Sequence, residues 1–133
     1  MKKLLKAATL TLAIACATAF LVACGIPAKP AKTRKNLEME GYTFNKTIQV
    51  AVTVGLEYLK IETQDVIVAT KVEEGEIDNV LLVYCKSKSK AKEVETEVVE
   101  ILRKNYSGEG EIRYGRDGKV IYFGTEDGVE DCN

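Results

Sequence analysis

The stretch Val80-Leu81-Leu82-Val83-Tyr84-Cys85 is apolar at every position. Six apolar residues without alternation are typical of a strand that is buried on both faces, so we expect this strand at the centre of a sheet. A second β-rich run, Val66 to Val72, precedes it, and Glu73 to Glu76 forms the turn between the two runs. This spacing predicts a β-hairpin.

The strongest helix signal follows this hairpin, from a cap at Ser87 or Ser89 to about Tyr106. Its apolar residues recur at helical spacing and form one continuous face, made of Ala91, Val94, Val98, Ile101 and Leu102. Glutamates lie off this face. The pattern predicts a long amphipathic helix that packs on the sheet.

The segment before the first hairpin predicts a helix and then a strand. Thr33 to Glu40 has the pattern of a short helix, and Gly41 suits the position after its end. Tyr42 to Val54 predicts a strand, because β-branched residues alternate with less apolar ones there. Leu56 to Ile61 fits either a helical turn or a second strand segment.

The C-terminal part of the chain predicts a second hairpin and a last short helix. Glu111 to Tyr114 and Val120 to Phe123 are the expected strands, with Asp117-Gly118 at the turn. Thr125 is expected to cap a helix over Glu126 to Asp131. These elements predict an α+β fold. We expect one antiparallel sheet of about four to five strands, with one long amphipathic helix and short terminal helices packed on one face.

The N-terminus has the features of a secretory signal. Lys2, Lys3 and Lys6 precede an apolar run, Ala7 to Val22, which is shorter than the ~20 residues that a spanning helix needs. A true transmembrane helix is the alternative. Leu21-Val22-Ala23-Cys24 resembles the lipobox of bacterial lipoproteins. The resemblance implies that the thiol of Cys24 is diacylglycerylated and that the signal is cut just before it.

The chain therefore divides into a cleaved signal peptide over residues 1–23, a lipidated Cys24 with a basic tether over residues 24–35, and an α+β domain over residues 36–133. The tether contains Pro27 and Pro30, which favour an extended chain. Its lysines and Arg34 could also bind anionic lipid, and the two roles are compatible.

Composition excludes several classes of function. The chain has no histidine, so it lacks the commonest general base and metal ligand. It has no P-loop or dinucleotide-binding motif, and no basic face with interleaved aromatics for nucleic acid. We therefore expect no catalytic residue, no metal and no cofactor. An acidic turn, Glu73 to Asp78, could hold Ca²⁺ weakly but lacks the EF-hand pattern, so we favour a solvated turn.

The roles of two cysteines and two tyrosines each have two possible explanations. Cys85 and Cys132 are permitted to form a disulfide outside the membrane, although two separate thiols, one of them buried, are favoured. Tyr114 and Tyr122 fall on facing strands of the second hairpin and could form a binding platform. Cross-strand packing explains them equally well and is favoured.

Three segments carry a wider resemblance: Asn36 to Tyr42, the helix begun by Ala91, and Gly118 to Glu126. From Asn36 onward the chain resembles a group of small uncharacterised lipoproteins of Gram-positive bacteria. The resemblance implies no activity, so no functional residues can be carried over. Members often carry an aromatic residue in place of Cys85 or Cys132, which counts against the disulfide.

These observations predict a lipoprotein anchored to the extracytoplasmic face of the cell membrane by lipid on Cys24. We expect it to act without catalysis, by binding or assembly at the cell envelope, with an envelope protein as partner at its sheet face or a strand edge. The alternative is a small-ligand or peptide-binding accessory subunit of a membrane transporter or enzyme.

Overall fold

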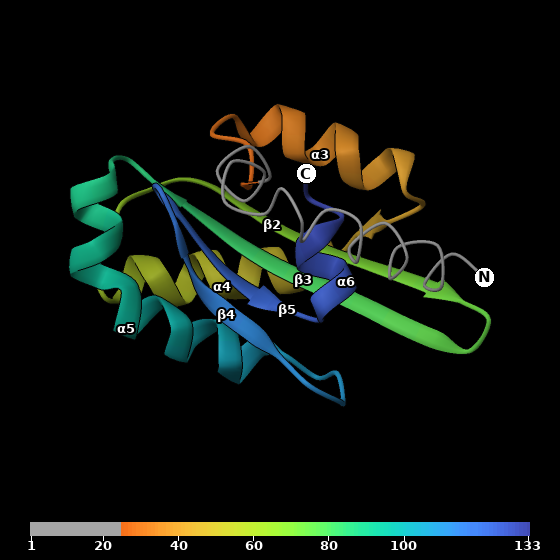
Figure 1. Ribbon diagram of the computed structural model, residues 1–133. Coiled ribbons are helices and arrows are strands. Elements are labelled where there is room, and N and C mark those ends of the chain that lie inside the picture. The colour runs from red at the N-terminus through yellow and green to blue at the C-terminus, as the bar shows by residue number, and fades with distance from the viewer. Residues whose placement is uncertain (1–24) are drawn as a thin grey trace.

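The computed structural model describes residues 25–133, so Cys24 and the predicted signal peptide, residues 1–23, lie outside the described residues. Its sheet has five strands in the order β1-β2-β3-β5-β4, and every neighbouring pair is antiparallel (Figure 1). The predicted α+β class with a single antiparallel sheet is therefore confirmed. No helix within residues 25–133 is long and apolar enough to cross a membrane.

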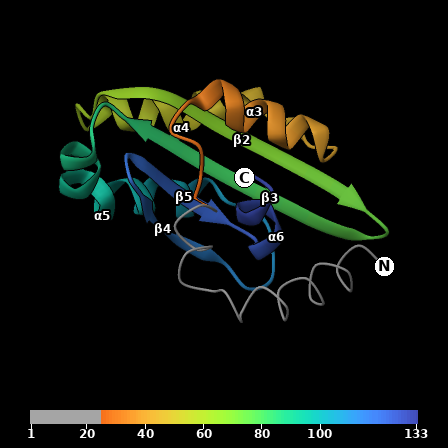
Figure 2. The same cartoon turned by 45° about the horizontal axis from the view of Figure 1, so that its top comes forward.

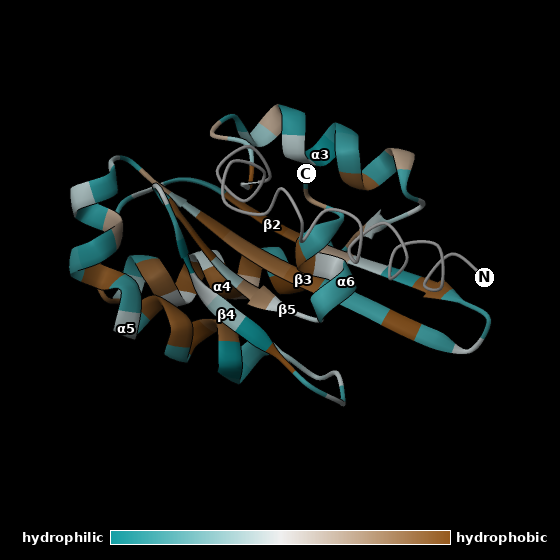
Figure 3. Ribbon diagram, in the orientation of Figure 1, coloured by the Kyte–Doolittle hydropathy of each residue, from teal (hydrophilic) through white to brown (hydrophobic). Residues whose placement is uncertain are grey.

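The strands are β1 (Thr43–Phe44), β2 (Thr63–Glu73), β3 (Glu76–Cys85), β4 (Arg113–Asp117) and β5 (Val120–Gly124). The helices are α3 (Pro30–Met39), α4 (Lys46–Tyr58), α5 (Lys88–Asn105) and α6 (Glu126–Glu130). Apolar residues gather in the middle of the sheet, whereas α3 and the far end of the β2–β3 hairpin are largely hydrophilic (Figure 3).

Helices cover both faces of the sheet, so the prediction that they share one face is wrong. On β3, Leu81, Val83 and Cys85 pack in the core cluster with α4 and α5. The alternate residues Val80, Leu82 and Tyr84 pack in a second cluster with Leu37 of α3 and with Cys132. Because side chains alternate along a strand, a strand that is apolar at every position needs cover on both faces. Figure 2 shows α3 and α5 on different sides of the sheet.

Helix α4 replaces most of the strand predicted over Tyr42 to Val54, of which only Thr43–Phe44 is extended. Asn45 begins the helix, since its side-chain oxygen accepts a hydrogen bond of 3.0 Å from the Ile48 N–H. Val52 and Leu56, one turn apart, are buried against the sheet. The period-2 pattern is misleading because residues spaced by two also include pairs spaced by four. Ile48 with Val52, and Val50 with Val54, therefore satisfy the helical spacing as well.

The other predicted elements are present, with some different bounds. Strand β4 covers Arg113–Asp117 instead of Glu111 to Tyr114, and α3 begins at Pro30 instead of Thr33. Ser87 caps α5, with its hydroxyl accepting from the Lys90 N–H, and the predicted apolar face of this helix is buried. Gly118 has φ +61° at the turn of the β4–β5 hairpin. Gly41 has φ +92° just after α3, and Thr125 caps α6 by accepting from the Gly128 N–H.

The basic segment 24–35 is not an extended tether, because α3 begins inside it at Pro30. Arg34 of this helix forms an ion pair with Asp65 of β2. Before the helix, the Tyr84 O–H donates to the Pro27 carbonyl at 2.7 Å, and the Ile26 N–H donates to Asp117 Oδ2 at 2.7 Å. The folded domain therefore includes the described residues from 25 onward.

Candidate functional site

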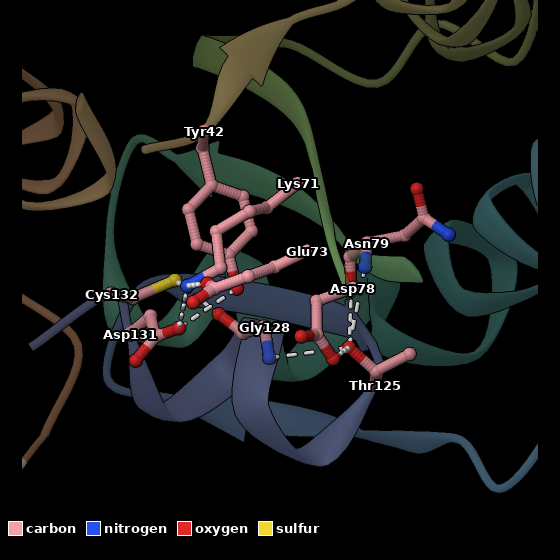
Figure 4. A network of polar contacts seen from close by, with 9 residues as sticks. All are labelled: Tyr42, Lys71, Glu73, Asp78, Asn79, Thr125, Gly128, Asp131 and Cys132. Carbon is pink, nitrogen blue, oxygen red and sulfur yellow. Dashed lines mark hydrogen bonds and ion pairs between the residues drawn. The ribbon is translucent and has the colours of Figure 1, made fainter. Parts of the chain in front are cut away.

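A buried polar network joins β2, the residue before β1 and the end of α6 (Figure 4). The Tyr42 O–H donates to Asp131 Oδ2 at 2.9 Å, and Lys71 Nζ lies 3.9 Å from the same oxygen. Lys71 Nζ also lies 3.3 Å from Glu73 Oε2 and 5.3 Å from the centre of the Tyr42 ring. Each buried charge in this network thus has a partner of opposite sign.

The titratable groups of this network are poor candidates for acid–base chemistry. Burial, and then the Asp131 carboxylate, raise the pKa of Tyr42 far above its ordinary value. Burial likewise raises the pKa of the Cys132 thiol to about 12, so at neutral pH the nucleophilic thiolate is scarce. The geometry supports a structural role, in which the network holds α6 against the sheet.

Two residues of the predicted acidic turn, Glu73 and Asp78, also help to hold α6 against the sheet. The Thr125 hydroxyl donates to Asp78 Oδ1 at 3.0 Å and accepts from the Asn79 N–H at 3.2 Å, while Glu73 pairs with Lys71. Within residues 25–133, no group of three or more acidic, Cys or His residues could hold a metal ion. The turn therefore offers no support for a calcium site.

Cys85 and Cys132 are both buried and free, so the disulfide considered from the sequence is not formed. Cys85 lies in the core cluster beneath α4 and α5, whereas Cys132 lies in the cluster on the other face of the sheet. The sheet separates the two thiols, which is why both stay reduced in this fold. Cys24, the predicted lipidation site, lies outside the described residues.

Tyr114 and Tyr122 do not form a shared platform. Tyr114 lies directly opposite Phe123 in the β4–β5 pair, and Gly115 lies opposite Tyr122. Tyr114 stacks on Phe123 with 6.0 Å between ring centres, whereas Tyr122 packs against the other core cluster. The two rings thus point to opposite faces of the sheet, and the favoured explanation, packing, fits this arrangement.

The outer face of α4 is the surface that sequence reasoning missed. Val50, Val54 and Tyr58 follow one another at intervals of four residues and are 60%, 57% and 87% exposed. Because side chains four apart share a helix face, these three form one apolar stripe. We call Val50, Val54 and Tyr58 the α4 stripe. Reading the same residues at helical spacing would have found it.

The stripe differs from the outer face of the neighbouring helix α5. The exposed residues of α5 include Glu93, Glu97 and Lys104, as expected of a face that meets only water. In α4, the charged residues are Lys46 near its start and Glu57 near its end. A second exposed apolar pair, Val72 and Ile77, lies cross-strand in the β2–β3 hairpin.

No family model, curated protein or solved structure matches this chain. The resemblance to small lipoproteins of Gram-positive bacteria therefore stays a prediction.

Proposed function

We propose that this chain is a lipoprotein held on the extracytoplasmic face of the cell membrane by an acylated Cys24, and that its domain binds another envelope protein through the α4 stripe. The exposure of Val50, Val54 and Tyr58 on a single helix face carries the binding part of this proposal. The lipobox-like residues before Cys24 carry the anchor.

An exposed apolar stripe favours association because contact with a partner removes it from water. The gain is about 25 cal/mol for each Å² of apolar surface buried, and contiguous apolar patches on a protein surface mark interaction sites. Helix α4 carries few charges, so the matching surface is expected to be apolar and uncharged. A helix of a membrane-bound protein, with its end close to the bilayer, has this chemistry.

The anchor restricts which partners can reach the stripe. Ile26 and Pro27 are hydrogen-bonded to the sheet, so a lipid on Cys24 would hold the whole domain at the membrane surface. Proteins within reach of α4 are then those that also reside at this surface.

Binding is favoured over catalysis because the titratable side chains that gather in this fold are buried and paired. Tyr42, Lys71 and Asp131 hold one another. The alternative function is an accessory subunit that captures a small ligand or peptide, and a tyrosine platform would be its binding surface. Tyr114 and Tyr122 lie on opposite faces of the sheet, so the α4 stripe is the better supported site.

The anchor is tested by the intact mass of protein extracted from its native membrane with detergent. We expect a chain that starts at Cys24 and carries added acyl mass. Cys24→Ser should leave the membrane fraction. A chain that keeps residues 1–23 without acyl mass would show a membrane-spanning segment instead.

The α4 stripe is tested with a photo-crosslinking residue at Val54, in membranes that contain the lipidated protein. The matched control carries the same residue at Glu97, which is exposed on the outer face of α5. We expect one adduct of defined mass from position 54 that is absent from position 97, and its loss in Val50→Asp. Equal adducts from both positions, or an adduct of twice the chain's own mass, would contradict an envelope-protein partner at α4.

A further inference from the structure

We propose that the end of the domain next to Cys24 is a basic surface that binds anionic phospholipid headgroups, so that the β2–β3 hairpin points away from the membrane. The inference rests on the proposed lipid anchor at Cys24. We call this surface the basic end and define it by six lysines, Lys60, Lys86, Lys88, Lys90, Lys92 and Lys119.

The six lysines come together because β2, β3, β4, β5 and α5 all begin or finish at the same end of the sheet. The Cys85 N–H, at the end of β3, donates to the Lys119 carbonyl at 2.9 Å. Lys119 Nζ donates to Gln64 at the start of β2 at 2.7 Å, and Lys86 Nζ lies 3.5 Å from Glu62. Figure 1 shows that α5 begins at this end of the sheet, away from the tip of the β2–β3 hairpin.

The described chain also begins at this end. Ile26 is hydrogen-bonded to Asp117, the residue before Gly118 in the β4–β5 turn. A Cβ atom on Gly118 would lie 3.8 Å from Lys88 Cε, so this turn adjoins the lysines at the start of α5. Neighbouring Cα atoms are about 3.8 Å apart. A lipid on Cys24 would therefore emerge beside the basic end, with no flexible tether between them.

The charges of this end suit an anionic surface. Lys60, Lys88 and Lys92 make no ion pair with any residue from 25 to 133. The first turn of α5 contains no acidic residue, although a helix N-terminus carries a positive partial charge and is stabilised by carboxylates. Lysines at this place oppose the helix dipole, so the stability of the helix does not account for them. Anionic headgroups would pair with both the lysines and the helix end.

The opposite end of the domain is acidic. Glu73, Glu74 and Glu76 lie at the tip of the β2–β3 hairpin, and Lys71 pairs with the first of them. Glu126 and Glu130 lie in α6, where both pair with Arg113. An anionic bilayer repels these groups while it attracts the lysines, so the two ends favour the same orientation. This orientation leaves the exposed Val72 and Ile77 of the hairpin away from the membrane.

The test uses the full lipidated protein, reconstituted in vesicles of phosphatidylcholine alone or of phosphatidylcholine with phosphatidylglycerol. A brief pulse of a membrane-impermeant amine reagent is followed by mass spectrometry of each lysine. We expect modification of Lys88 and Lys92 to be about fivefold lower in the anionic vesicles, which corresponds to ~1 kcal/mol for each lysine at such a surface. Lys104, at the far end of α5, should be modified equally in both. High salt should remove the difference because it screens exposed charges.

Matched variants and the mass of the anchor distinguish a failure of the basic end from a failure of the lipid anchor. Lys88→Glu with Lys92→Glu should abolish the difference in modification at Lys86, whereas Lys104→Glu should preserve it. Equal modification of Lys88 in both kinds of vesicle, with the protein bound to both, would overturn the basic end and leave the anchor intact. Protein that fails to associate with either kind of vesicle and lacks acyl mass would overturn the anchor itself.

Discussion

The backbone N–H of Ile26 donates a hydrogen bond of 2.7 Å to Oδ2 of Asp117, across 91 residues of sequence. This bond attaches the start of the described chain to the β4–β5 turn. It makes a segment with the composition of a linker part of the folded domain. It also holds Ile26 at the β4–β5 turn, which adjoins Lys88 of the basic end.

Asp117→Ala should loosen the first residues of the domain. The substitution removes the acceptor of the Ile26 N–H, and we expect a loss of about 1 kcal/mol in the free energy of unfolding. Amide hydrogen exchange of Ile26 should accelerate, while that of Leu81 in the central strand should stay slow. Asp117→Asn keeps a side-chain oxygen and the turn preference, so its effect should be smaller. Unchanged exchange at Ile26 in Asp117→Ala would show that the bond is not formed in solution.

Tyr84 should make the stability depend on alkaline pH. Burial raises the pKa of its hydroxyl to about 12, above the ~10 of a tyrosine in an unfolded chain. Its stabilising contribution is complete below pH ~10 and is lost as the pH rises toward 12. The variant Tyr84→Phe should have a lower Tm at pH 7, because the Thr33 hydroxyl and the Pro27 carbonyl each lose a hydrogen-bond partner. Its Tm should fall less between pH 10 and 12. A fall in Tm as steep as that of the parent chain would contradict a role for Tyr84 ionisation. The control is Tyr58→Phe, at an exposed position, which should follow the parent chain.

The Arg34–Asp65 pair should make the stability depend on acid pH. The hydrogen bond from Arg34 lowers the pKa of Asp65 below its ordinary value. Stability from this pair is thus complete above the unfolded value of ~3.9 and is lost as the pH falls through the lower folded pKa. Thermal melts from pH 7 to pH 3 should show a smaller acid loss in Asp65→Asn than in the parent chain. A loss of the same size in both would rule out the pair as its source.

Val98→Asp should unfold the domain. Val98 is fully buried between α5 and the sheet, where a carboxylate would have neither water nor a partner. We expect a loss of about 3 kcal/mol or more, measured by denaturant unfolding. Glu97→Ala, at the exposed neighbouring position, should change stability little. A Val98→Asp variant with an unchanged melting temperature would refute the assignment of the helix face.

Cys85 and Cys132 should resist thiol reagents in the folded protein. Burial raises the pKa of both thiols, and neither is exposed. In denaturant without reductant, both should react with a chromogenic disulfide reagent. Glu76→Cys, at an exposed position of the hairpin, should react at once in the folded state. If neither thiol reacts after unfolding, Cys85 and Cys132 form a disulfide, which would contradict the structure.

Several elements can be predicted from the sequence because local chemistry decides them. The β2–β3 hairpin needs only two apolar runs and a glycine turn, and α5 needs only its cap at Ser87 and one apolar face. The Asp117-Gly118 turn demands a positive φ, which the sequence supplies directly. In such elements the neighbouring residues contain most of the information.

The segment around α4 could not be assigned in this way. Its apolar residues recur at every second position, and alternate members of that series are four apart, so the helical and the extended pattern both fit. Packing of Val52 and Leu56 on the sheet selects the helix. The α4 stripe exists only as a result of that selection. In a strand, Val50, Val54 and Tyr58 would share one face with Val52 and Leu56, because every second side chain points the same way.

Long-range contacts also decide the ends of the chain and its cysteines. The alternation of β3 places Cys85 on one face of the sheet, whereas α6 brings Cys132 to the other. Residues 25–29 have no secondary structure of their own, and hydrogen bonds to Asp117 and Tyr84 hold Ile26 and Pro27 in place. Length, local pattern and the lipobox-like signal are properties of neighbouring residues and can be read from the sequence. The basic end and the separation of the thiols depend on partners that are distant in the sequence, such as Lys119 and Gln64, and only folding brings those partners together.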